Sequence, residues 1–122
     1  MGAEPVRMDA ELHDRVLGAG SHLPHVAAYA LAATLGAIPA DVIEGLRRLP
    51  TQSLRDTTRV AASSPVMWRD IFLDNRAEVL PLIDALGKQV EALRAAIAES
   101  DGKRIEQLLE AGKSGRDRLV PG

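Results

Sequence analysis

Two histidines, His22 and His25, interrupt an apolar stretch that reads GAGSHLPHVAAYALAATL. They stand three residues apart, so they share a face if a helix continues through Pro24. Imidazoles in such a pair are suited to binding zinc, to hydrogen bonding a ligand, or to a polar position in the core. Zinc needs a third ligand, and neither His13 nor an HExxH pattern supplies one at ligand spacing. The pattern therefore predicts no metal site and leaves a pocket and a polar core open.

The segment RDTTR, residues 55 to 59, brings two arginines and an aspartate together just before an apolar VAA. Asp56 and Arg59 are i and i+3 neighbours on a helix, so the carboxylate is expected to hold the guanidinium in one orientation. An oriented guanidinium is well suited to a bidentate contact with a carboxylate ligand. The alternative is a surface ion pair, which contributes little to stability.

Trp68 and Phe72 are the only tryptophan and the only phenylalanine, and they stand four residues apart. This spacing puts both rings on one helical face, either as an anchor between core helices or as the wall of a pocket. The remaining residues show no nucleophile with its base, no glycine-rich phosphate loop and no paired carboxylates. No catalytic residue is therefore predicted in this sequence.

The composition is typical of a helical protein. The 122 residues suffice for one domain, and 46% are hydrophobic while only 2% are aromatic. There is no cysteine, so disulfides and thiolate metal sites are excluded. The net charge of -2 argues against nucleic acid or an anionic membrane as partner. With no apolar run long enough to span a bilayer and no signal-peptide pattern, we expect a cytoplasmic protein.

The helix signals divide the chain into a short first segment and one helical domain. Residues 1–8 are expected to be an extended segment, a strand or a linker, and residues 9–122 a helical domain. Asp9 is expected to cap a helix that runs to about residue 35 with a kink or break at Pro24. A second helix is expected to have Pro39 in its first turn and to end by Pro50.

Further helices are expected in the second half of the sequence. A short helix is compatible with residues 54–63, and Ser64 with Pro65 predicts the start of the next. Apolar residues at intervals of three and four then predict a long helix over about 75–99. Asp101 is expected to cap a last helix, which Gly112 and Gly115 weaken. The predicted fold class is all-α.

The order of SHLPH, then RDTTRVAASSPVMWRDIFLDNR, then a long helix and a short one resembles the helical C-terminal domain of prephenate and arogenate dehydrogenases. The entry segment MDAELHDRVLGAGSHLPH fits the same family. This resemblance implies a helical bundle that forms a homodimer. It also implies NAD- or NADP-dependent oxidative decarboxylation of prephenate in tyrosine biosynthesis.

The resemblance implies six substrate-binding residues, which are His22, His25, Arg55, Asp56, Arg59 and Trp68. The substrate is a small dicarboxylate, and Arg59 is the expected carboxylate clamp with Asp56 as its orienter. The two histidines are expected to line the substrate side and the tryptophan to form a wall. Arg55 is expected to reach toward the partner subunit's site.

Two departures from the family pattern stand out. The family has a glycine just before its RD, where this sequence has Gln52, Ser53 and Leu54. It also has a GxGxxG cofactor domain and a histidine that accepts the hydroxyl proton, and neither occurs here. NAD or NADP is therefore expected to bind a dinucleotide-binding domain in cis or in trans. This chain alone is expected to be inactive. Residues 1–8 are expected to be a remnant of that domain or a linker. The alternative is a non-catalytic helical interaction or regulatory module.

Overall fold

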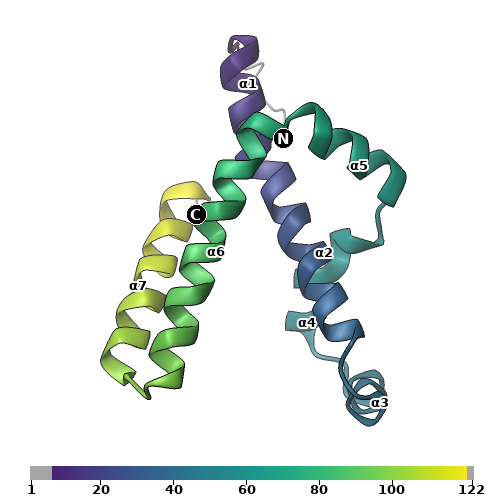
Figure 1. Ribbon diagram of the computed structural model, residues 1–122, viewed down its shortest axis with the longest axis vertical. Helices are drawn as coiled ribbons and strands as arrows, with labels where there is room; N and C mark the ends of the chain where they lie inside the picture. The colour runs from purple at the N-terminus through teal and green to yellow at the C-terminus, as the bar shows by residue number, and fades with distance from the viewer. Residues whose placement is uncertain (1–6, 121–122) are drawn as a thin grey trace. The chain divides into compact units, whose positions relative to one another are not determined.

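The computed structural model describes residues 7–120, which fold into helices joined by short turns and contain no strand (Figure 1). The elements in chain order are α1 (Ala10–Leu17), η1 (Gly18–His22), α2 (Leu23–Gly36), α3 (Ala40–Arg48), α4 (Gln52–Thr58), η2 (Arg59–Ala62), α5 (Pro65–Asp74), α6 (Arg76–Ala98) and α7 (Gly102–Leu119). The predicted all-α class is confirmed. The expected extended segment lies mostly outside the described residues, and Arg7 and Met8 have no regular secondary structure.

Three of the predicted helix starts are capped as expected. The side chain of Asp9 accepts the backbone N–H of Leu12 at 2.8 Å, and that of Asp101 accepts the N–H of Arg104 at 3.0 Å. Ser64 accepts the backbone N–H of Met67 at 3.3 Å. Each cap satisfies a donor that has no partner within its own helix.

The break expected at Pro24 is a π-helical turn that precedes the proline. Element η1 lies between α1 and α2, and the backbone N–H of Leu23 donates to the carbonyl of Gly18, five residues back. Pro24 is then the second residue of α2. Because proline has no N–H for the carbonyl four residues before it, the chain changes its hydrogen-bonding register just upstream. The result is that His22 and His25 lie on two different elements.

Other helix ends differ in detail from the expectations. Pro39 is the N-cap of α3 and not a residue of its first turn, because its extended backbone precedes the helix. Helix α6 continues through Pro81, and α7 continues through Gly112 and Gly115 to Leu119. The glycines weaken the helix propensity of α7 without ending it, since propensity is a small term for each residue.

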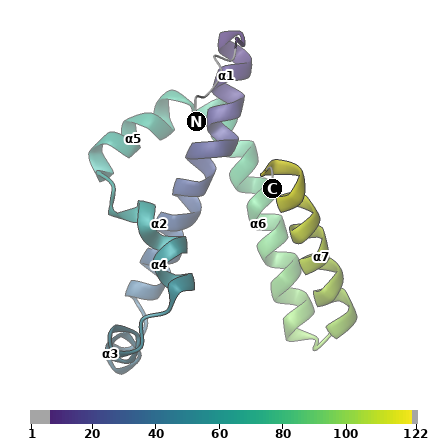
Figure 2. The ribbon, with the colours of Figure 1, turned by 180° about the vertical axis from the view of Figure 1, so that it is seen from behind.

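The chain divides into two compact units between Ile83 and Asp84. In the first unit, α2 is the central helix, and α4 and η2 lie against it (Figures 1 and 2). The Tyr29 hydroxyl on α2 donates to the carbonyl of Ser63, which follows η2, at 2.8 Å. The buried side chains of this unit include Ala28, Trp68 and Val79.

The second unit is a hairpin formed by the remainder of α6 and by α7. Both views show the two helices side by side and connected by a tight turn (Figures 1 and 2). Ser100 in this turn has a φ of 54°, which is the left-handed region. Ala96 is the buried hydrophobic residue of this unit.

No single helix among residues 7–120 has the length and apolarity needed to cross a membrane. The segments Ala10–Gly36 and Ala40–Arg48 meet that criterion only as a pair, and they are bent by 116° relative to each other.

Candidate functional site

His22, His25 and Trp68 form one aromatic cluster in the first unit. The His25 ring stacks on Trp68 with ring centroids 3.5 Å apart and an angle of 16° between the planes. His22 meets the same indole edge-on, at 5.9 Å and 80°. Three of the six predicted site residues, which come from η1, α2 and α5, are therefore brought together.

Local sequence explains how α5 presents its aromatic residues. Ser64 caps the helix and Pro65 occupies its first turn, so the helix begins at a defined residue. Trp68 and Phe72 then follow one turn apart, with ring centroids at 5.5 Å. Trp68 is only 7% exposed, which makes it both a core residue and a member of the cluster.

The side chain of Asn75 contacts the ring of His22 at Nδ1. The Asn75 side-chain nitrogen, Nδ2, lies 2.9 Å from the carbonyl oxygen of Asp14 and 3.1 Å from His22 Nδ1. His22 is 8% exposed. Burial lowers the pKa of His22, nearby His25 lowers it further, and Asp14 partly opposes the shift. The ring is therefore neutral at pH 7.

His25 is held by its own helical turn. Its Nδ1 lies 2.8 Å from the backbone carbonyl of Ser21, in the π-helical turn, and the side chain is half-buried. This bond fixes the ring flat against Trp68. The two histidines are thus fixed by different partners, His22 by a residue at the junction of α5 and α6 and His25 by the preceding turn.

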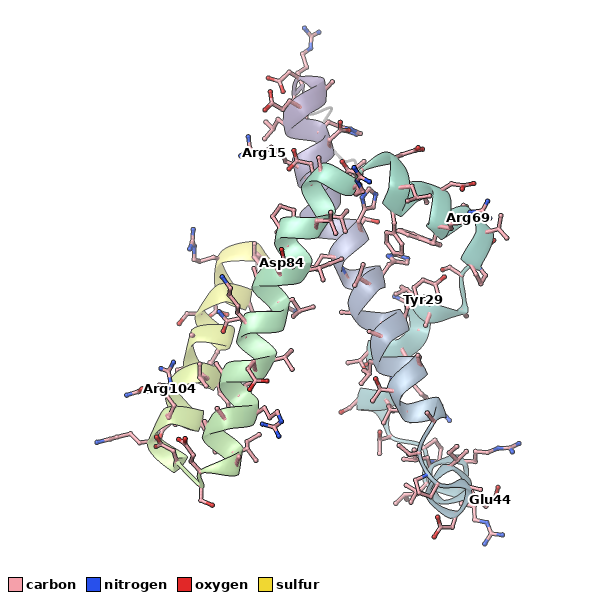
Figure 3. The ribbon with its side chains drawn as sticks, in the orientation of Figure 1. Arg15, Tyr29, Glu44, Arg69, Asp84 and Arg104 are labelled. Carbon is pink, nitrogen blue, oxygen red and sulfur yellow. The ribbon has the colours of Figure 1, made fainter. Side chains whose placement is uncertain are left out.

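A pocket of about 220 Å³ opens beside the cluster. It lies between α2 and α5 and is lined by Tyr29, Pro65, Trp68, Arg69 and Phe72. Figure 3 shows Tyr29 on α2 and Arg69 on α5. The Arg69 Nε donates to the carboxylate of neighbouring Asp70 at 3.0 Å, and the pair is well exposed. The pocket combines an apolar aromatic floor with one cation at its rim.

The RDTTR segment is placed differently from the expectation. Arg55, Asp56 and Arg59 are all exposed, and within residues 7–120 they make no hydrogen bond or ion pair with the cluster. Asp56 accepts a hydrogen bond from Gln52 Nε2 at 2.8 Å, and the expected ion pair with Arg59 is not formed.

The reason lies in the backbone. Helix α4 ends at Thr58, and Arg59 begins the 3-10 turn η2. The backbone at Thr58 has a φ of -108° and a ψ of -4°, so it leaves the α-helix before Arg59 and the α-helical placement assumed for Asp56 and Arg59 does not hold. Gln52 stands four residues before Asp56 on the same helix and takes the carboxylate.

Sequence reasoning missed Asn75 and Tyr29 as members of the site. Each is the only residue of its type in the chain, which was a signal available in the sequence. Their importance depends on bonds to Asp14 and Ser63, which are distant in sequence. Within residues 7–120, no three His, Asp or Glu side chains lie close enough together to hold a metal ion.

Residues 9–111 match the protein family described as the prephenate dehydrogenase dimerization domain. The chain is 42% identical over 108 residues to a cyclohexadienyl dehydrogenase of Zymomonas mobilis, which covers 88% of this chain and 37% of that protein. It is 32% identical over 114 residues to a prephenate dehydrogenase of Bacillus subtilis, covering 93% of this chain and 30% of that one. The chain therefore spans about a third of the length of these relatives.

Solved structures show the same fold. The prephenate dehydrogenase of A. aeolicus, solved in complex with hydroxyphenyl propionate and NAD+, is 36% identical with a TM-score of 0.75, over 93% of this chain and 39% of that chain. The Synechocystis arogenate dehydrogenase has a TM-score of 0.85 at 22% identity, over 93% of this chain and 41% of that chain. The second likeness supports the fold alone.

Proposed function

The chain belongs to the prephenate dehydrogenase family, whose dimerization domain it matches over residues 9–111, and on this premise we propose that it supplies the substrate-carboxylate side and the dimer interface of a prephenate or arogenate dehydrogenase. The proposed reaction is NAD- or NADP-dependent oxidative decarboxylation of prephenate in tyrosine biosynthesis. Such a substrate carries carboxylates and a ring, so its site needs cationic donors and an aromatic wall. The observation that carries the proposal is the stacked cluster of His22, His25 and Trp68 beside an open pocket.

Arg59 is the proposed carboxylate clamp. Its guanidinium is exposed and forms no ion pair with another described residue, so no internal partner has to be displaced when a ligand carboxylate arrives. In this proposal Asp56 gives up the hydrogen bond that it accepts from Gln52 and accepts one from the Arg59 guanidinium instead. The new bond orients Arg59. Arg55 is proposed to reach toward the site of a partner subunit.

The cofactor is proposed to bind outside this chain. The sequence has no glycine-rich turn of the kind that receives a dinucleotide pyrophosphate, so its residues do not fit that group. In the complete enzyme the dinucleotide supplies the hydride acceptor, and a separate domain in cis or in trans holds it. The residues of this chain are proposed to bind and orient the substrate and to exclude water from its ring.

The homodimer is supported by apolar surface in each unit. In the first unit, a groove of about 240 Å³ is lined mostly by hydrophobic residues, among them Phe72, Leu73, Leu80 and Ile83. In the second unit, a depression of about 440 Å³ on α6 is lined mainly by Val90, Leu93, Ile97 and Ala98. Leu80 is 51% exposed and Ile97 is 62% exposed. Apolar patches of this kind are usually covered by a partner, and a second copy is the commonest one.

The alternative function, a non-catalytic interaction or regulatory module, is less well supported. Nothing in the site favours it over the dehydrogenase, since the aromatic cluster and the exposed guanidinium both suit a small carboxylate. The relatives that cover most of the chain are named as dehydrogenases.

The proposal is tested by ligand binding at the cluster. Trp68 is the only tryptophan, so its fluorescence reports this site. Titration of hydroxyphenyl propionate is expected to change this emission saturably, and Arg59→Ala to weaken binding by about 10- to 200-fold through loss of charge-assisted hydrogen bonds. Arg47→Ala, at an exposed position on α3, is the matched control and should bind as the parent does. No saturable response, or equal affinity in both variants, contradicts the proposed function.

A further inference from the structure

The orientation of the Asn75 amide follows from its partners. Its Nδ2 atom lies 2.9 Å from the carbonyl oxygen of Asp14, and a carbonyl oxygen only accepts hydrogen bonds. The nitrogen end of the amide must therefore face Asp14. The second hydrogen of the same nitrogen is directed at His22 Nδ1, which lies 3.1 Å away. His22 Nδ1 is then the acceptor, and the neutral ring carries its proton on Nε2.

The same logic gives His25 the opposite tautomer. Its Nδ1 lies 2.8 Å from the carbonyl oxygen of Ser21, which again only accepts. His25 Nδ1 must carry the proton, and Nε2 is bare when the ring is neutral. Two histidines that contact one indole are thus held with their protons on different nitrogens.

We propose that Asn75 is a positioning residue that holds His22 as a hydrogen-bond donor at Nε2, so that with the bare Nε2 of His25 the site offers one donor and one acceptor to a ligand. The inference concerns the free protein, and only its meaning for the ligand rests on the proposed function. A substrate that carries both carboxylates and a hydroxyl matches this set, since a carboxylate accepts from His22 and a hydroxyl donates to His25.

The arrangement also separates the roles of the two rings. His22 cannot take a second proton on Nδ1 without losing its bond to Asn75. Its charged and titratable neighbours are His25 and Asp14, and burial adds to the cost of charge. His22 is therefore a neutral donor and not a proton acceptor. His25, whose Nε2 is bare, is the group of the pair that is able to accept.

The two contacts of the Asn75 side chain also depend on a close approach between η1 and the start of α6. A β-carbon added at Gly18 would lie 3.4 Å from Asn75 Nδ2 and 3.4 Å from the β-carbon of Glu78. Gly18 is buried, and its missing side chain leaves the amide room to reach Asp14 and His22 together. The π-helical turn and the start of α6 therefore act jointly to set the tautomer.

The test is long-range ¹H–¹⁵N NMR of the histidine rings in the 122-residue chain without ligand, at pH about 8, which is above the ordinary histidine pKa of about 6.5. His22 is expected to be protonated at Nε2 and His25 at Nδ1, with exposed His13 as the internal reference. In Asn75→Asp, the carboxylate only accepts, so His22 is expected to move its proton to Nδ1 and its pKa to rise. Gln107→Glu makes the same amide-to-acid change at an exposed position on α7 and is expected to leave all three rings unchanged.

Each outcome decides the inference. A bare Nε2 on His22 in the parent chain, or an unchanged tautomer in Asn75→Asp, overturns it. If Asn75→Asp does not fold, Asn75→Ala is expected to give a mixture of tautomers, and a single unchanged Nε2–H form there overturns it equally. With the parent tautomers as expected, Asn75→Ala should weaken hydroxyphenyl propionate by roughly 2- to 10-fold, the value of one hydrogen bond. Correct tautomers in a chain that binds no such ligand would instead support the inference and contradict the proposed function.

Discussion

His25 and Trp68 stack face to face, with ring centroids 3.5 Å apart and ring planes at 16°. This contact joins the first turn of α2 to α5, and the same indole meets His22 edge-on. The first unit buries few large side chains, so the contacts of the Trp68 ring are a large part of its core packing. Two members of the aromatic cluster, His22 and Trp68, are therefore also buried residues of this unit.

Replacing Trp68 is expected to destabilise the fold. Trp68→Ala removes a side chain that is 7% exposed and leaves a cavity, with an expected loss of about 3 to 5 kcal/mol in the free energy of unfolding. Urea unfolding followed by circular dichroism measures it. Met67→Ala, at a residue 52% exposed, is the control and should change stability by less than about 0.5 kcal/mol. Similar values for the two variants would show that Trp68 is not a core residue.

Two glycines of η1 are expected to respond differently to alanine. No atom lies within 4 Å of a β-carbon added at Gly20, so Gly20→Ala should stabilise the chain by about 0.5 to 1 kcal/mol through lower entropy of the unfolded state. At Gly18 the added carbon meets Asn75 and Glu78 at 3.4 Å, so the gain should be smaller or reversed. Thermal unfolding of both variants gives the comparison. If Gly18→Ala is as stable as Gly20→Ala, then Asn75 and Glu78 move to accommodate the new β-carbon without loss of stability.

The lowered pKa of His22 predicts how stability depends on pH. The folded ring takes up a proton less readily than the unfolded ring, whose pKa is near 6.5. Below pH 6.5 the unfolded state therefore binds more protons, and the free energy of unfolding should fall as the pH drops from 6.5 toward the folded pKa. Above 6.5 this contribution is fully present and constant.

The pH effect is measured by urea unfolding of the parent chain and of His22→Gln at several pH values. The variant should show a shallower decline below pH 6.5 than the parent chain. Identical slopes in the two proteins would exclude His22 as the source.

The proposed homodimer predicts a mass of twice the chain by light scattering at tens of micromolar. A charge placed on either apolar surface should oppose association, because it would be buried without a partner. Leu80→Asp in the first unit and Ile97→Asp in the second are the test variants, and Leu49→Asp, at a residue 75% exposed outside both surfaces, is the control. A monomeric parent chain with cooperative unfolding would contradict the dimer.

Local sequence predicted where several helices of this protein begin. Asp9, Ser64 and Asp101 start helices because their side chains accept N–H groups from the turn that follows, and such bonds span only three residues. The long apolar repeat predicted α6, which runs from Arg76 to Ala98. The resemblance to a family was likewise recognised from the order of SHLPH and RDTTR along the chain alone.

Tertiary structure decided which of those residues act together. Asn75 reaches Asp14 and His22 across 61 and 53 residues of sequence, and no local pattern encodes such a bond. Asp56 was predicted to pair with Arg59, but the backbone leaves the α-helix at Thr58 and Asp56 accepts a hydrogen bond from Gln52 instead. Helix starts depend on neighbours in the chain, whereas a hydrogen-bond partner depends on how helices meet. The proton position inferred for His22 therefore depends on how α1, η1 and the junction at Asn75 between α5 and α6 meet, whereas that of His25 follows from the turn just before it.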